Sequence, residues 1–363
     1  MHRLMRRTHR ALLLCTLFFE LLQCDEVDPQ TCADGNDSTE DIPKSNSMQP
    51  PPPGAVTSGA RPPQREAYAT AVFANEDYVC GALVLATRLR QLDPEIGRSR
   101  ELACIVTKEV GQEAQDALRS VGWIVYEREL TPHPIPLETR LKLSSAESFE
   151  WVYTKLQAWT LPYDKVIMMD SDLLPQPALN IPSLFAKKQL SADINHPSQP
   201  QWFNSGLMVI QPRNKTFEEM AASRFSLKSY DMGDQGFLNN FFAGIWKKLH
   251  ANVIFTSDAV VHANNWKKQQ MNSGDITARL REFGGLHYFG FKPWTCAARC
   301  ANAGRLCSLD GQQRNVMRIA KRYMSWMLPE ANFLWWEAAA ELPEELLAIC
   351  ATKEKFHCPI PIV

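Results

Sequence analysis

The sequence predicts an α/β fold, in which a mixed, mainly parallel sheet is flanked by helices and followed by a small cystine-rich helical tail. Two observations predict it. From about residue 67, apolar runs of strand length alternate with segments whose apolar residues recur at helical spacing. Such alternation is typical of a parallel sheet with both faces covered by helices. Near the C-terminus, helical segments are instead interspersed with clustered cysteines, at positions 296, 300, 307, 350 and 358.

The elements follow one another in a regular order. Strand-like runs lie at 68–74, 102–107, 123–126 and 165–169. Segments of helical spacing lie at 78–92, 112–120 and 150–160, and in the tail at 316–327. Trp335, Trp336 and residues 346–350 are expected to complete the helical appendage, closed by cystines. In sheets of this kind, ligands bind beyond the carboxyl ends of the strands. We therefore expect functional side chains just after the strands, at 75–78 and at 170–172.

The N-terminal residues are predicted to lie outside this domain. A basic start precedes an apolar run at 11–19, which is the pattern of a secretory signal peptide. A short uncleaved anchor is the alternative, since the run is shorter than the roughly 18 residues of a comfortable span; a basic start on a cytosolic protein is a third. The sequence thus predicts a signal peptide or anchor at 1–24, a disordered Pro-rich stem at 25–66, a folded domain at 67–300 and a helical appendage at 301–363.

Net charge, cysteine spacing and glycosylation sequons limit which classes of function and which compartments are compatible with the sequence. A formal net charge of -1 is unlike the basic excess of nucleic-acid-binding proteins. The ten cysteines include no Cys-x-x-Cys pair, which favours disulfides of an oxidising compartment over a zinc site. Glycosylation sequons at Asn36 and Asn214 are compatible with a lumenal address. We expect contact with a membrane only through an N-terminal anchor.

The motif Asp170-Ser171-Asp172 follows a predicted buried strand. Two carboxylates at i and i+2 in a bend can face one cation, and hard oxygen ligands suit Mg²⁺ or Mn²⁺. Such a metal neutralises a departing diphosphate. Metal-dependent phosphotransferases share this context, but they usually carry Thr or Val after the second aspartate, where this chain has Leu173 and Leu174.

Four further motifs accompany the aspartates in a fixed order. They are Trp-Val-Tyr-Thr-Lys at 151–155, Phe-Asn-Ser-Gly at 203–206, Asp-Met-Gly-Asp-Gln at 231–235 and His-Tyr-Phe-Gly-Phe-Lys-Pro-Trp at 287–294. As an ordered set, they resemble the glycogenin-like family 8 glycosyltransferases, from about residue 68 to residue 294. The chain is more similar to the plant xylan glucuronosyltransferase branch, through Glu150-Trp151, Met208-Val209-Ile210 and Trp335-Trp336.

The resemblance implies a GT-A, Rossmann-like nucleotide-sugar-binding domain and a role for each matching residue. The metal, Mn²⁺, would be bound by Asp170, Asp172 and His287. Lys292 would donate to the diphosphate of the UDP-sugar. The implied donor-binding residues are Asn75, Tyr78, Ser171, Asn204, Gly290 and Lys292. Those implied near the reacting sugar carbon and the acceptor are Lys155, Asp231, Asp234 and Gln235.

The family retains anomeric configuration, which leaves two mechanisms open. Asp234 would be the nucleophile of a double displacement; alternatively, the acceptor attacks from the front face and the departing phosphate takes its proton. Plainer roles are also open: Asp231 as a helix N-cap, Asp234 as a first-turn carboxylate, and Gly206 and Gly236 as positions of close backbone approach.

The predicted function is transfer of a hexosyl or hexuronosyl unit from a UDP-sugar to a polysaccharide or glycan acceptor in the Golgi lumen, or in a secreted form. Glucuronate is the first expectation for the sugar, followed by glucose or galactose. Since no tyrosine occurs between Tyr230 and Tyr288, self-glucosylation of the glycogenin kind is not expected. The alternative is a catalytically silent, sugar-binding interaction protein on the same fold.

Overall fold

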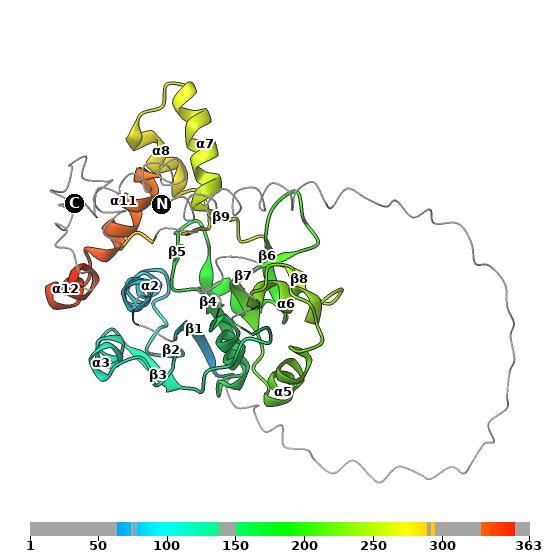
Figure 1. The fold of residues 1–363 in the computed structure, drawn as a ribbon. Coiled ribbons are helices and arrows are strands. Elements are labelled where there is room, and N and C mark those ends of the chain that lie inside the picture. The colour runs from blue at the N-terminus through cyan, green and yellow to red at the C-terminus, as the bar shows by residue number, and fades with distance from the viewer. Residues whose placement is uncertain are drawn as a thin grey trace, which may run out of the picture.

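In the computed structural model, the described residues are 64–73, 76, 78–136, 139, 150–288, 292–294 and 328–352 (Figure 1). Their centre is a seven-stranded sheet of order β3-β2-β1-β4-β7-β6-β8. The strands are β1 (Glu66–Val72), β2 (Arg100–Val106), β3 (Trp123–Glu127), β4 (Lys165–Met169), β6 (Ser191–Ile194), β7 (Phe203–Ile210) and β8 (Lys247–Lys248). All neighbours pair in parallel except β7, which is antiparallel to both β4 and β6. The predicted mixed, mainly parallel sheet is confirmed.

Helices cover both faces of this sheet because successive side chains of a strand point to opposite sides. On β1, Tyr68 and Val72 join one core with helices α2 (Val79–Leu92) and α3 (Gln112–Ser120). Ala67 and Ala69 join the other core. That second core is covered by η2 (Val152–Thr160), α5 (Asn214–Ser223) and α6 (Asp234–Phe241).

A second, three-stranded sheet lies beside the first and has the order β5-β10-β9. It comprises β5 (Leu173–Pro175), β9 (Val253–Phe255) and β10 (Gly285–His287). Strand β10 is antiparallel to β5, with His287 opposite Leu173. Helices α7 (Thr256–Lys268) and α8 (Ser273–Leu280) connect β9 to β10, and the short η3 (Ile181–Ala186) follows β5. This pairing brings His287 beside the aspartate motif.

The C-terminal helices α11 (Pro329–Ala339) and α12 (Glu344–Thr352) pack against α2, and α11 also contacts α8 (Figure 1). A disulfide joins Cys80 of α2 to Cys350 of α12. This disulfide therefore joins the C-terminal tail covalently to the main domain. The predicted helix at 316–327 and the cysteines at 296, 300, 307 and 358 lie outside the described residues, and the domain boundaries remain predictions.

Most predicted elements are confirmed to within two residues, and one is helical as predicted but differs in helix geometry. Segment 150–160, predicted as helical, forms the 3₁₀ helix η2. Seven consecutive residues of η2, from Tyr153 to Trp159, are buried. It thus lacks the solvent face of an amphipathic α-helix, and packing on all sides sets its geometry.

None of the helices in the described part of the chain has the length and apolar character needed to cross a membrane.

Candidate functional site

The strand directions place several loops at one edge of the large sheet. Strand β6 runs parallel to β4, because both are antiparallel to β7. The carboxyl ends of β1, β4 and β6 and the start of β7 therefore meet. At this edge lies a cavity of about 810 Å³, a size typical of small-molecule sites. Among its lining residues are Phe73, Tyr78, Lys155, Asp170, Ser171, Asp172, Asn195, Asn204, Tyr230, Asp231, Asp234, Gln235 and His287. We call it the donor cavity, after the UDP-sugar donor that the sequence analysis predicts.

Asp170, Asp172 and His287 form a candidate metal-ligand cluster in this cavity, which we call the metal-ligand cluster. One ligand atom of each lies within 4.8 Å of those of the other two. The Nε2 of His287 is 3.2 Å from Asp172 Oδ1 and 3.7 Å from Asp170 Oδ2. Its Nδ1 is buried and has no hydrogen-bond partner among the described residues, so Nε2 is the nitrogen directed at the cluster. Two carboxylates and one imidazole fit a divalent cation such as Mn²⁺ or Mg²⁺.

The imidazole reaches this position because Gly206 has no side chain. A Cβ on Gly206 would lie 2.9 Å from His287 Nδ1 and 2.8 Å from Asn204 Oδ1. Phe255 covers the His287 ring in a stacked arrangement, with ring centroids 5.1 Å apart. The predicted role of Gly206 in close approach is confirmed.

The two aspartates differ in their charge environment. Burial raises the pKa of Asp170. Burial also acts to raise the pKa of Asp172, but the positive charge of Lys292 and the hydrogen bonds from Lys292 and His287 outweigh it and hold that pKa below its usual range. Lys292 Nζ donates to Asp172 Oδ2 at 2.5 Å and to the Tyr288 carbonyl at 2.7 Å. Asp172 is therefore the better-compensated carboxylate of the pair.

Lys155 connects this cluster to a second carboxylate. Its Nζ lies 2.8 Å from Asp170 Oδ1, 2.9 Å from Asp234 Oδ2 and 3.3 Å from Ser205 Oγ. Burial acts to lower the pKa of Lys155, but the two carboxylates outweigh it and raise the pKa above its ordinary value. The lysine stays charged and holds Asp170 and Asp234 on opposite sides of one ammonium group.

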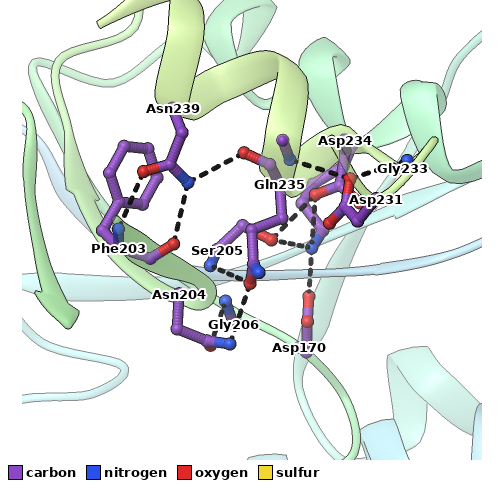
Figure 2. A network of polar contacts seen from close by, with 12 residues as sticks. Asp170, Phe203, Asn204, Ser205, Gly206, Asp231, Gly233, Asp234, Gln235 and Asn239 are labelled. Carbon is purple, nitrogen blue, oxygen red and sulfur yellow. Dashed lines mark hydrogen bonds and ion pairs between the residues drawn. The ribbon is translucent and has the colours of Figure 1, made fainter. Parts of the chain in front are cut away.

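Asp234 and Gln235 begin helix α6 and face the start of β7 (Figure 2). Asp234 Oδ2 accepts from Ser205 Oγ at 2.9 Å. Gln235 Oε1 accepts from Asn204 Nδ2 at 2.9 Å and from the Ser205 amide at 3.2 Å. Asn239, one turn further along α6, exchanges two 2.8 Å hydrogen bonds with the backbone of Phe203. Together these contacts fix the first turn of α6 against β7.

Asp231 lines the cavity but is occupied within the protein. Its Oδ1 accepts from the amides of Gly233 and Gly236, at 2.8 and 3.0 Å, and from Ser229 Oγ at 2.7 Å. It therefore satisfies free amides at the start of α6, although the N-cap position that was predicted for Asp231 is occupied by Gly233. A Cβ on Gly236 would lie 2.6 Å from Asp231 Oδ1, so the predicted close approach at Gly236 is confirmed.

Most of the predicted site residues converge on this cavity. Tyr78, Lys155, Asp170, Ser171, Asp172, Asn204, Asp231, Asp234, Gln235 and His287 all line it, and Lys292 is bonded to Asp172. Asn75 and Gly290 lie outside the described residues. Sequence reasoning missed Asn195, whose Oδ1 accepts from Gln235 Nε2 at 3.2 Å. The signal was available, since Asn195 directly follows strand β6, but β6 is short and irregular in register.

The segment that carries Lys292 is supported by the tail. Tyr288 Oη donates to the Ala331 carbonyl of α11 at 2.6 Å, and Trp336 Nε1 donates to the Pro293 carbonyl at 3.1 Å. Trp294 packs on Trp335, with ring centroids 5.4 Å apart. Helix α11 thus supports the segment that carries Lys292.

Comparison with known proteins identifies relatives. No family model matches the chain. It is 30% identical to UDP-glucuronate:xylan alpha-glucuronosyltransferase 2 of Arabidopsis thaliana over 303 residues, which are 83% of this chain and 45% of the relative. It is 35% identical to glycogenin-1 of Oryctolagus cuniculus over 171 residues, 46% of this chain and 48% of the relative. The chain therefore spans less than half the length of these curated relatives.

Among solved structures, galactosyltransferase LgtC with donor and acceptor sugar analogues aligns with a TM-score of 0.45 and 17% identity, over 77% of this chain and 98% of that one.

Proposed function

We propose that this chain, a homologue of the plant xylan glucuronosyltransferases and of the glycogenins, transfers a sugar from a UDP-sugar to a carbohydrate acceptor. The resemblance predicted from the ordered motifs is confirmed by these relatives. The observation that carries the proposal is the convergence of the metal-ligand cluster and Asp234 on one cavity, with Lys292 bonded to Asp172 of the cluster. A cation site, a lysine for phosphate and a carboxylate for the sugar are the parts that such a transfer needs.

Asp170, Asp172 and His287 would bind Mn²⁺, which when bound supplies a Lewis acid that offsets the negative charge of a departing diphosphate. Lys292 is already held at Asp172 and is one of the few strong donors near the cluster. We propose that it donates to the diphosphate when the donor binds. Tyr78, whose ring lies 5.6 Å from Lys292 Nζ, flanks this position on the uridine side.

Asp234 is the carboxylate that we place at the sugar. Its Oδ2 is held by Lys155 and Ser205, so the carboxylate keeps one orientation in the cavity. In a double displacement with retention, Asp234 attacks the anomeric carbon. In front-face transfer, it orients the sugar, and the proton of the acceptor hydroxyl passes to the departing phosphate. Gln235, Asn204 and Asp231 fix the geometry around it through the hydrogen bonds described above.

Glucuronate is the first donor to test, because the plant relatives are UDP-glucuronate:xylan alpha-glucuronosyltransferases, with glucose and galactose next. We propose a xylan-like or other glycan acceptor and a Golgi or secreted location. The latter rests on the basic and apolar N-terminal pattern and on the Cys80–Cys350 disulfide, since such bonds persist in oxidising compartments.

The test is release of UDP by the purified chain from a panel of UDP-sugars, with Mn²⁺ or with chelator, in the presence of xylan and other oligosaccharides. An Asp172→Ala variant serves as the inactive control. Metal-dependent turnover of one donor that is lost in the variant supports the transferase. UDP binding without turnover of any donor would instead favour the silent, sugar-binding alternative.

A further inference from the structure

The side-chain amide of Gln235 uses its full hydrogen-bonding capacity within the protein. Its Oε1 accepts from Asn204 Nδ2 at 2.9 Å and from the backbone amide of Ser205 at 3.2 Å. Its Nε2 donates to Asn195 Oδ1 and to Tyr230 Oη, both at 3.2 Å. Since a backbone N–H can only donate, the Ser205 amide settles which atom of the Gln235 amide is the oxygen. Tyr230 is therefore the acceptor in its bond with Gln235.

A second side-chain amide also donates to Tyr230. Asn239 Nδ2 lies 3.4 Å from Tyr230 Oη. The backbone of Phe203 settles the orientation of Asn239, because the Phe203 amide donates to Oδ1 and the Phe203 carbonyl accepts from Nδ2 (Figure 2). The phenolic oxygen is thus the acceptor in both bonds. Its own O–H remains as a hydrogen-bond donor.

This O–H group is available to a ligand. Tyr230 lines the donor cavity, and its hydroxyl donates to no acceptor in the described part of the chain. Trp202 stacks on the ring at a centroid distance of 4.2 Å and so restricts its orientation. Burial and the negative charge of Asp231 raise the pKa of Tyr230, so the hydroxyl keeps its proton at neutral pH.

An open acceptor follows this donor in the sequence. Asp231 also lines the donor cavity, and its three hydrogen bonds all go to Oδ1. Its Oδ2 accepts none from the described residues. A hydroxyl group can accept from Tyr230 and donate to Asp231, whereas an anionic group would be repelled by the carboxylates of Asp231 and Asp234. The two side chains therefore suit an uncharged sugar hydroxyl.

Tyr230 lies at the sugar end of the donor cavity. It is bonded to Gln235 of α6, the residue after Asp234, which we place at the sugar. Tyr78, on the proposed uridine side, follows β1, whereas α6 contacts β7. Strand β4, which leads into the aspartate motif, lies between β1 and β7.

We propose that the Tyr230 hydroxyl, together with Asp231, binds one hydroxyl group of the donor sugar and selects donors that carry it. The inference rests on the proposed transferase function. It adds a specificity-determining residue, Tyr230, that lies outside the ordered motifs.

The test compares two variants that disturb Gln235 alike. Tyr230→Phe and Asn195→Ala each remove one acceptor of Gln235 Nε2 at 3.2 Å. Only Tyr230→Phe also removes a hydroxyl donor from the cavity wall, so Asn195→Ala is the matched control. The probes are UDP, the UDP-sugar that the wild type binds most tightly, and the monodeoxy analogues of that UDP-sugar.

Dissociation constants are measured by calorimetry with Mn²⁺ and without acceptor. We expect Tyr230→Phe to weaken binding of the parent UDP-sugar by about threefold to tenfold, and to bind UDP, which lacks the sugar, as the wild type does. One monodeoxy analogue should bind equally to the wild type and to Tyr230→Phe, because the recognised hydroxyl is absent from it. Asn195→Ala should keep the wild-type preference for the parent UDP-sugar over that analogue.

Wild-type affinity of Tyr230→Phe for the parent UDP-sugar would overturn the proposal. So would an undiminished effect of Tyr230→Phe on every monodeoxy analogue, or the same loss of preference in Asn195→Ala, since either result would mean that Tyr230 acts only by supporting Gln235. Absence of UDP binding by the wild type would instead contradict the proposed function, on which the inference rests.

Discussion

The metal-ligand cluster is supplied by two segments that are held in different ways. The aspartate motif follows β4, whose five residues are all buried at the centre of the large sheet. Its backbone is fixed locally, since the Asp170 amide donates to the Gly206 carbonyl at 2.9 Å and the Leu173 amide donates to the Asp170 carbonyl at 3.0 Å. His287 instead ends a three-residue strand, and the chain after it packs on α11, some 40 positions later.

This difference has a physical consequence. A loop fixed by a central strand opens only when the sheet unfolds, whereas a segment fixed by a docked helix can loosen when that helix detaches. The positions of the metal ligands in the first segment should therefore depend on side chains of that segment. The position of His287 in the second segment should also depend on the disulfide and on α11, which lie far along the chain from Lys292.

Asp170→Asn removes a charged ligand from the first segment and one partner of Lys155. We expect kcat/KM for the UDP-sugar to fall by about 100-fold or more, because both metal affinity and the position of Asp234 depend on this carboxylate. Steady-state release of UDP at several Mn²⁺ concentrations measures the effect. Asp116→Asn, on the exposed surface of α3, is the control, and equal activity of the two variants would contradict the assignment.

Gly206→Ala tests the meeting point of the two segments without removing a ligand. The added Cβ would displace the His287 ring, so we expect Mn²⁺ affinity to fall by about 10- to 100-fold. Gly285→Ala, two residues before His287 on β10, is the matched control, because its Cβ would make only ordinary contacts, at 3.4 Å or more. Mn²⁺ titration by electron paramagnetic resonance distinguishes them; similar affinities would show that the close approach at Gly206 is unimportant.

Replacing both Cys80 and Cys350 by serine removes the covalent link between α2 and α12. The unfolded chain then no longer contains the loop that the disulfide closes across a sequence separation of 270. We expect the free energy of unfolding to fall by about 2–4 kcal/mol. The KM for the UDP-sugar should rise a few-fold, because α11 no longer holds the segment of Lys292 firmly. Thermal denaturation and donor kinetics measure the two effects. Loss of stability with an unchanged KM would show that the disulfide does not affect binding of the donor.

Tyr288→Phe makes the smallest change to the second segment. It leaves the Ala331 carbonyl without its hydrogen bond from Oη and should lower the free energy of unfolding by about 1–2 kcal/mol. Tyr126→Phe is the control. It removes a phenolic hydroxyl of β3 that hydrogen-bonds the hydroxyl of Tyr163, away from the donor cavity. Only Tyr288→Phe should lower Mn²⁺-dependent turnover. An equal change of turnover in both variants would speak against a role for α11 in positioning.

The same contrast explains what could be predicted from the sequence. Strand β4 and the aspartates after it are local in sequence, so apolar patterning and position were enough to predict them. The pairing of His287 with these aspartates depends on β10 finding β5, and no local pattern specifies that contact; the family resemblance supplied it. Asn195, the 3₁₀ geometry of η2 and the Cys80–Cys350 bond were not predicted, because each is decided by tertiary packing.

The most direct test of the account is the metal dependence of UDP binding, measured by calorimetry with Mn²⁺ and with chelator. The account predicts that Mn²⁺ tightens binding of UDP by the wild-type chain by about tenfold or more, and that His287→Asn abolishes most of this gain. Equal affinity for UDP with and without Mn²⁺, or an undiminished gain in His287→Asn, would contradict the claim that both segments bind one metal.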